Sequence, residues 1–211
     1  MHVTALPVRH LLSLCLLTVA CLPIRATATE TPIAGEWISD CHPVGRDGRH
    51  GLLTRVALSP ASVQARATLY ADPACTRPNA EARYQGVVLE VRAEGDGRYA
   101  LEHRIAAISL TLIDAGVAAQ YNARPDSIGC GLGDWQTGIA REVSGRRCTA
   151  FRFAAAGTVL HERAWLGGES GKEQLHFGSL PLVWDADAAD KRAEVPGPVA
   201  FRRAGAAADA P

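Results

Sequence analysis

The stretch GVVLEVRAEGDGRYALEHRIAAISLTL, residues 86–112, decides the fold class of this chain. Apolar residues occupy alternate positions on both sides of the dipeptide Asp96-Gly97. Those before it are Val87, Leu89, Val91 and Ala93, and those after it are Tyr99, Leu101, Ile105, Ile108, Leu110 and Leu112, with His103 on the same face. Such alternation is typical of half-buried strands, and Asp-Gly between two such runs favours a tight turn. The stretch therefore predicts an antiparallel β-hairpin with Asp96-Gly97 at its tip.

The same two-residue period recurs elsewhere in the chain. Residues 63–69 alternate without a break, and further short strands are expected at 53–58, 138–143, 149–154, 158–165, 173–177 and 198–203. Only residues 114–122 favour a helix, with Asp114 as N-cap and Arg124-Pro125 as its end. Open strand edges and a single apolar face are both unstable in water. We therefore predict an all-β protein, an antiparallel β-barrel or curved half-barrel of about eight to ten strands with one short helix.

The N-terminus has the order of a secretion signal. Arg9 and His10 precede the apolar run Leu11–Leu22, and Ala26-Thr27-Ala28 is a small-x-small cleavage site. A lipoprotein signal with acylation at Cys21 is the minor alternative, and the run is shorter than the roughly twenty residues of a transmembrane helix. The expected organisation is a signal peptide at residues 1–28, one barrel-like domain at 29–203 and a disordered tail at 204–211, with no integral membrane segment in the mature chain.

Charge argues against a polyanionic partner. The chain has 22 basic and 22 acidic residues, and removal of residues 1–28 takes away Arg9 and Arg25 and no acid, which leaves a formal charge of −2. No nucleic-acid partner is expected from this balance. The location that the signal predicts is the periplasm or the extracellular space.

Four of the six cysteines remain after signal cleavage: Cys41, Cys75, Cys130 and Cys148. In an oxidising compartment these predict two disulfides that stabilise a secreted domain. The pairing of nearest neighbours in the chain is one of the three connectivities that four cysteines allow, and the sequence does not choose among them. There is no CxxC motif and no paired-histidine spacing, so neither a metal site nor a cofactor is expected.

Several motifs resemble those of a known family. Residues 35–41 read GEWISDC, residues 52–55 read LLTR and residues 70–78 read YADPACTRP. Later in the chain come Asn122, Cys130-Gly131, Trp135 and EQLHFG at residues 173–178. In order and spacing this set resembles the adenomatosis polyposis coli down-regulated 1 domain family over nearly all of the mature chain. The opening Gly-x-Trp is also similar to that of lipocalins, in which the tryptophan closes one end of a barrel.

This resemblance implies an extracytoplasmic, disulfide-bonded, barrel-like binding domain that is not an enzyme. The animal members of the family are membrane-anchored inhibitors of Wnt signalling and are thought to bind lipid-modified ligand. This chain departs from them because it carries one copy of the domain instead of two and no C-terminal transmembrane segment is predicted. The departures weaken the inference of a Wnt-related role and leave the expectation of apolar-ligand binding.

Four residues are the candidate ligand contacts: Trp37, Trp135, Tyr99 and His103. Each has an alternative interpretation, because large aromatics mostly fill cores, a plug is the preferred role for Trp37, and a histidine among apolar neighbours is more often hydrogen-bonded inside a core than catalytic. Trp165 and Trp184 carry the same two interpretations. Small inward-facing residues would leave space for a ligand inside a barrel. The candidates are Ala65, Ala67, Ala93 and Ala107.

No catalytic motif has the required spacing. The segment Gly168-Glu169-Ser170-Gly171 lacks the Gly-x-Ser-x-Gly spacing of a nucleophile elbow. We therefore predict a non-enzymatic protein that binds a lipid or other apolar small molecule in its barrel. The alternative is a protein-interaction or envelope-associated domain with a filled core that uses residues 42–51 or 123–137. The sequence names no ligand and no oligomeric state.

Overall fold

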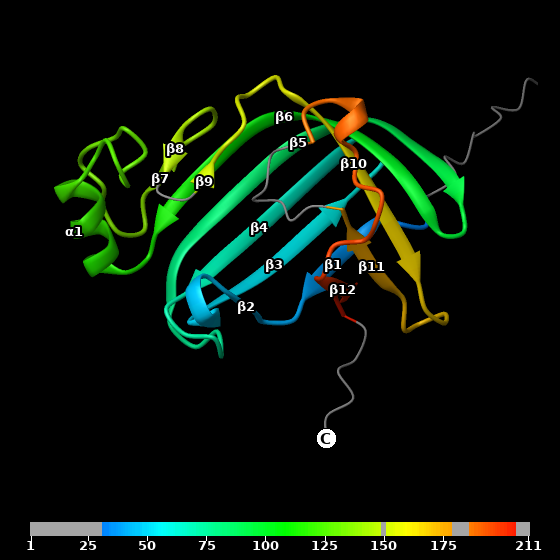
Figure 1. Ribbon diagram of the computed structural model, residues 1–211, viewed down its shortest axis with the longest axis horizontal. Coiled ribbons are helices and arrows are strands. Elements are labelled where there is room, and N and C mark those ends of the chain that lie inside the picture. The colour runs from blue at the N-terminus through cyan, green and yellow to red at the C-terminus, as the bar shows by residue number, and fades with distance from the viewer. Residues whose placement is uncertain (1–30, 149–150, 179–185, 206–211) are drawn as a thin grey trace, which may run out of the picture.

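The computed structural model describes residues 31–148, 151–178 and 186–205. The expected signal peptide, most of the expected tail, part of the expected strand at 149–154 and Trp184 lie outside these residues. Strands β1 to β12 and one α-helix make up most of the described chain, as Figure 1 shows. The prediction of a disulfide-bonded, all-β, antiparallel barrel with one short helix is confirmed.

The predicted hairpin is present as the two longest strands, β5 (Pro78–Gly95) and β6 (Arg98–Leu112). Asp96 and Gly97 connect them with φ angles of 50° and 70°, and positive φ at both central residues is the geometry of a type I′ turn. A Cβ atom at Gly97 would lie 2.1 Å from the carbonyl oxygen of Leu166. Glycine is therefore required there both by conformation and by space.

Eight strands close into a barrel. Around the ring their order is β1–β12–β11–β10–β6–β5–β4–β3, and β1 pairs with β3 to complete the circle. The bounds of the other six strands in the ring are β1 (Gly35–Ser39), β3 (His50–Leu58), β4 (Ser62–Tyr70), β10 (Val159–Gly167), β11 (Gln174–Phe177) and β12 (Ala200–Arg203). All of the pairings are antiparallel, and closure leaves the ring without a free edge.

Short elements flank the ring. Strand β2 (His42–Val44) pairs with β3, β7 (Ala140–Glu142) pairs with β6, and β8 (Arg147–Cys148) pairs with β9 (Phe151–Arg152) in a separate two-stranded sheet. The helices are η1 (Arg46–Gly48), α1 (Ala115–Ala123) and η2 (Ala189–Lys191). The predicted N-cap of α1 is confirmed, because the Asp114 carboxylate accepts a hydrogen bond from the Val117 amide at 2.9 Å.

The predicted inward face of β5 is wrong for three of its four residues, while Val91 packs against the core as expected. Val87 and Leu89 are 49% and 42% exposed, and Ala93 is exposed as well, so none of the three lines the interior. Even-numbered residues of β5 point inward as far as Val88, and the register shift between Val88 and Glu90 then moves the inward position to Val91. A single extra residue in one strand has this effect because the side-chain period is two.

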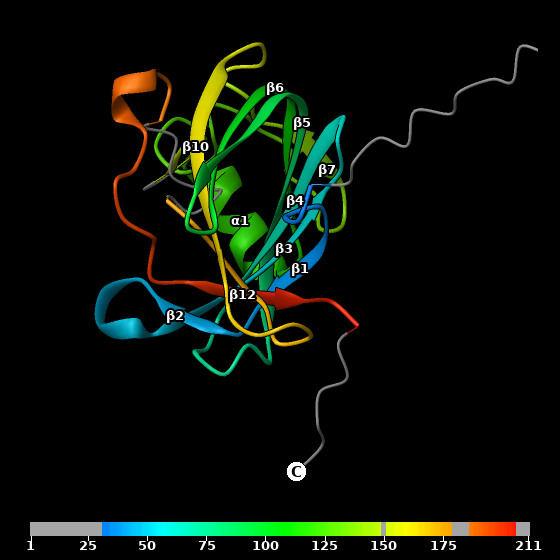
Figure 2. The same ribbon diagram turned by 90° about the vertical axis from the view of Figure 1, so that its right-hand side faces the viewer.

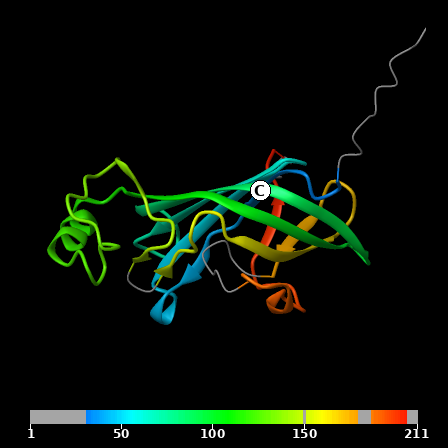
Figure 3. The same cartoon turned by 90° about the horizontal axis from the view of Figure 1, so that it is seen from above.

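The two ends of the barrel are built differently. Figures 1 and 3 place α1 at one end, while β1 and β12 lie toward the other. Figure 2 looks along the barrel, with the strands surrounding the distant α1. The disulfides join Cys41 to Cys75 and Cys130 to Cys148, which is the nearest-neighbour pairing. The first links the end of β1 to the β4–β5 connection, and the second closes the segment after α1.

Candidate ligand-binding site in the barrel

Trp37 is on β1, which lies toward the end of the barrel opposite α1. Its side chain is fully buried, and the indole Nε1 donates a hydrogen bond to the Ile33 carbonyl at 2.9 Å. The Arg203 guanidinium carbon lies 4.4 Å from the centroid of a Trp37 ring, while Nη1 and Nη2 donate to the carbonyls of Ala34 and Pro32 at 3.0 and 2.8 Å. These contacts combine a cation–π interaction with fixed hydrogen bonds and hold Trp37 in place, which is compatible with the plug that we expect from the sequence.

The middle of the barrel contains a buried polar pair, Tyr84 and His103. Each is 5% exposed, and the Tyr84 hydroxyl lies 2.5 Å from the His103 Nδ1. Burial, with a further contribution from the Glu162 carboxylate, raises the pKa of Tyr84, so the phenol keeps its proton. Burial, together with the charge of His161, lowers the pKa of His103 from 6.5 to about 4. At neutral pH the phenol therefore donates to Nδ1 of a neutral imidazole.

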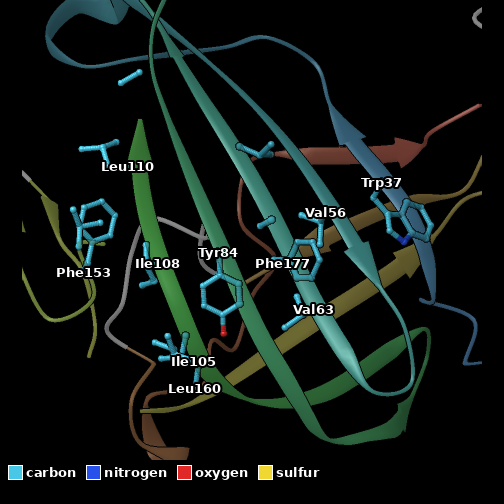
Figure 4. Close-up of a cluster of buried hydrophobic side chains, with 14 of the residues drawn as sticks. Trp37, Val56, Val63, Tyr84, Ile105, Ile108, Leu110, Phe153, Leu160 and Phe177 are labelled. Atoms are coloured by element: carbon cyan, nitrogen blue, oxygen red, sulfur yellow. The ribbon is translucent and has the colours of Figure 1, made fainter. Parts of the chain in front are cut away.

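Gly86 provides the space for the Tyr84 ring. A Cβ atom at this position would lie 2.5 Å from the Tyr84 hydroxyl oxygen and 2.9 Å from a methyl carbon of Val63. The ring thus packs over a residue of its own strand that has no side chain. Figure 4 shows Tyr84 among the buried hydrophobic residues of the core, which include Val63 and Ile105.

A small apolar cavity lies at the α1 end of the barrel. Its volume is about 40 Å³. The residues that line it come from four ring strands, from α1 and from the Cys148 region: Leu52, Ala67, Leu69, Ala80, Ala82, Leu110, Tyr121, Cys148 and Phe153. Three of these are alanines on neighbouring strands, and their short side chains leave the space. Figure 4 shows two of the bulkier lining residues, Leu110 and Phe153, side by side.

The cavity is large enough for a small chemical group. About 10–15 Å³ of such volume suffices for one water molecule, so 40 Å³ accommodates a short hydrocarbon segment and not a whole lipid. Its lining is almost entirely aliphatic and aromatic, which disfavours water. The chemistry available there is apolar packing without covalent reactivity.

Trp135 holds together the segment that covers this end. The Asn122 side chain accepts a hydrogen bond from the Trp135 amide at 2.7 Å and donates one to its carbonyl at 2.9 Å. The indole Nε1 donates to the Gly129 carbonyl at 3.0 Å, and the ring meets Tyr121 edge to face. Tyr121 also lines the cavity, so Trp135 packs against the side chain of a lining residue without lining the cavity itself.

The four residues predicted as ligand contacts do not meet at one place. Trp37 and Trp135 lie toward opposite ends of the barrel, His103 lies between them, and Tyr99 is partly buried near the tip of the β5–β6 hairpin. Of the alanines expected to leave room, Ala65 and Ala67 are buried and only Ala67 lines this cavity, while Ala107 is partly exposed.

Sequence analysis missed most of the residues that line the cavity. Ala80 and Ala82 alternate with polar residues, which is a usable strand signal, but the predicted strand began only at residue 86. Tyr121 comes from α1 and Phe153 from the segment just after β9, and the Cys130–Cys148 disulfide ties this part of the chain together. No local pattern carries that information.

Comparison of the chain with models of known protein families and with curated proteins finds no match. Among residues 31–148, 151–178 and 186–205, no helix is long and apolar enough to cross a membrane. Within the same residues, no group of three or more His, Cys, Asp or Glu side chains is arranged to hold a metal ion.

Proposed function

We propose that this chain is a secreted or periplasmic, non-enzymatic binding protein that receives an apolar group of its ligand at the α1 end of the barrel. The observation that carries the proposal is the apolar cavity of about 40 Å³ under α1 and the Cys130–Cys148 segment. The two disulfides support an oxidising compartment, since such bonds persist outside the cytosol.

The resemblance to the adenomatosis polyposis coli down-regulated 1 domain family supports the same proposal. Members of that family are thought to bind lipid-modified ligand, and the Trp37 plug is similar to the closed end of a lipocalin barrel. With one end closed, a ligand would enter from the α1 end. Tyr84 engages Nδ1 of His103 inside the core, which supports a structural role for this histidine and not that of a solvent-facing base.

The size of the cavity limits how much of a ligand it holds. Burial of each methylene contributes about 0.8 kcal/mol, so a segment of about four methylenes would contribute about 3 kcal/mol. A fatty acyl chain would therefore place only its end in the cavity. Any greater affinity has to come from movement of the covering segment or from contacts at the mouth.

Titration of the mature, disulfide-bonded protein with dodecanoate, followed by calorimetry, tests this proposal. The Ala82→Leu variant fills the cavity, and Ala106→Leu adds the same side chain at an exposed position of β6. We expect Ala82→Leu to weaken binding about tenfold or more and Ala106→Leu to leave it unchanged. Equal binding by both variants, or no binding by the parent protein, would contradict the proposal and favour a protein-interaction domain.

A further inference from the structure

Three arginines form a row across the outer face of the barrel. Arg55 on β3 is directly opposite Arg66 on β4, and Arg66 is directly opposite Arg83 on β5. All three side chains are exposed. Neighbouring strands are about 4.8 Å apart, and like charges directly opposite each other destabilise a sheet. Repulsion within the two arginine pairs therefore lowers the stability of the free protein.

Neutralisation of this row is incomplete. Glu81 lies 2.7 Å from the Nε of Arg83 and 3.6 Å from the Nε of Arg66. In the described part of the chain, Arg55 forms no ion pair within 4.0 Å. Among the described residues, the three arginines therefore form ion pairs with a single carboxylate, and Glu36 borders the groove without such a pair, although the mature protein as a whole is slightly acidic. An anion is therefore attracted by the arginines of this face and not by the net charge of the protein.

The row borders a groove of about 230 Å³. The next row of residues toward the Trp37 end lines it too, with Ala57 opposite Gln64 and Gln64 opposite Gln85. The small side chain of Ala57 leaves space between the long polar ones, and Glu36 lies beside it on β1. Figure 1 shows the four strands that form this surface, β1, β3, β4 and β5, side by side.

We propose that this groove binds a phosphorylated sugar. Guanidinium groups bind phosphate oxygens with paired, charge-assisted hydrogen bonds, which lysine cannot reproduce. The amides of Gln64 and Gln85 donate and accept hydrogen bonds, which suits neighbouring sugar hydroxyls. The negative charge of a bound phosphate reduces the electrostatic repulsion between the arginines. This site is on the opposite face of the strands from the barrel interior, so it does not depend on the apolar ligand.

The test is an NMR titration of the mature, disulfide-bonded protein that follows the arginine Nε–Hε signals. Glucose 6-phosphate is the probe, with inorganic phosphate and glucose in parallel. We expect saturable shifts of the Arg55 and Arg66 signals with glucose 6-phosphate, weaker ones with phosphate and none with glucose. Added salt should weaken binding. Absence of saturable shifts would overturn the proposal, and equal affinity for inorganic phosphate would overturn the assignment of a sugar phosphate.

Substitutions distinguish a specific binding site from non-specific electrostatic attraction to the protein surface. Arg66→Gln should weaken binding of glucose 6-phosphate about tenfold or more, and Arg66→Lys should weaken it less. Arg104→Gln is the matched control, because Arg104 is an exposed arginine on β6 outside the groove. Without ligand, Arg66→Gln should melt at the same or a higher temperature than the parent, which shows that the variant folds. Equal weakening by Arg66→Gln and Arg104→Gln would overturn the proposal.

Discussion

Replacement of His103 by glutamine is expected to remove a large part of the acid sensitivity of folding. Burial, with the charge of His161, lowers the pKa of His103 from 6.5 to about 4 in the folded protein. Below about pH 6.5 the unfolded chain binds a proton that the folded chain excludes, so stability is full above that pH and falls as the pH drops toward about 4. A difference of about 2.5 pKa units corresponds to about 3 kcal/mol. In the variant, the amide oxygen can accept the Tyr84 hydrogen bond without titrating.

Urea unfolding between about pH 7.5 and about pH 4, with the disulfides intact, measures this effect. The quantity of interest is the free energy of unfolding of the parent minus that of His103→Gln at each pH, because contributions from carboxylates cancel in this difference. It should decrease by about 3 kcal/mol on acidification. His42→Gln, on β2 outside the ring, controls for loss of a histidine. A difference that stays flat, or that increases as the pH falls, would refute the reasoning.

Three further predictions concern the plug, the core and the first disulfide. Arg203→Met should lower the free energy of unfolding by about 2 kcal/mol in urea denaturation, because the cation–π contact with Trp37 and two hydrogen bonds to backbone carbonyls are lost. Gly86→Val should cost about 2 kcal/mol or more and disturb the near-ultraviolet circular dichroism, because its Cβ would lie 2.5 Å from the Tyr84 hydroxyl. Asp72→Asn should speed reduction of the neighbouring disulfide by dithiothreitol, because the Asp72 carboxylate accepts four hydrogen bonds that order this loop.

The pKa of Asp72 supports the last prediction. Desolvation acts to raise it, but hydrogen bonds from Thr76, Arg77 and Ala74 outweigh that effect and lower the pKa. A carboxyl group with a lowered folded pKa stabilises the protein above its unfolded pKa, and this stabilisation is lost as the pH falls through the folded value. Opening of this loop in the parent protein should therefore become more frequent at acidic pH. Hydrogen exchange of the Ala74, Thr76 and Arg77 amides, corrected for the pH dependence of intrinsic exchange, measures this opening.

Local signals in the sequence predicted the local structure well. Asp96-Gly97 fixes the hairpin turn because both residues adopt positive φ, and Asp114 fixes the start of α1 through its side-chain hydrogen bond. The face of β5 could not be predicted, because the residues that form the register shifts near Val88 have no distinctive composition. The apolar run Val87-Val88-Leu89 fits either face, and the structure places Val88 against the core and Val87 and Leu89 outside.

The barrel was predicted from the sequence, but the strand pairings that close it were not. Closure of the ring depends on β1 pairing with both β3 and β12, and β12 lies more than 160 residues later in the chain. The choice among disulfide connectivities depends on which loops the fold brings together, which no local pattern shows. The cavity lining and the arginine row are also products of register, because Arg55, Arg66 and Arg83 become neighbours only when three strands align.

Native mass spectrometry of the mature protein, exported with its disulfides intact, tests the proposed barrel ligand most directly. Organic extraction then identifies any molecule that is released. We predict a stoichiometric adduct that carries a fatty acyl chain or similar apolar group, and its loss in Ala82→Leu. A clean apo mass that takes up no lipid on titration would contradict the proposal of an apolar ligand in the barrel.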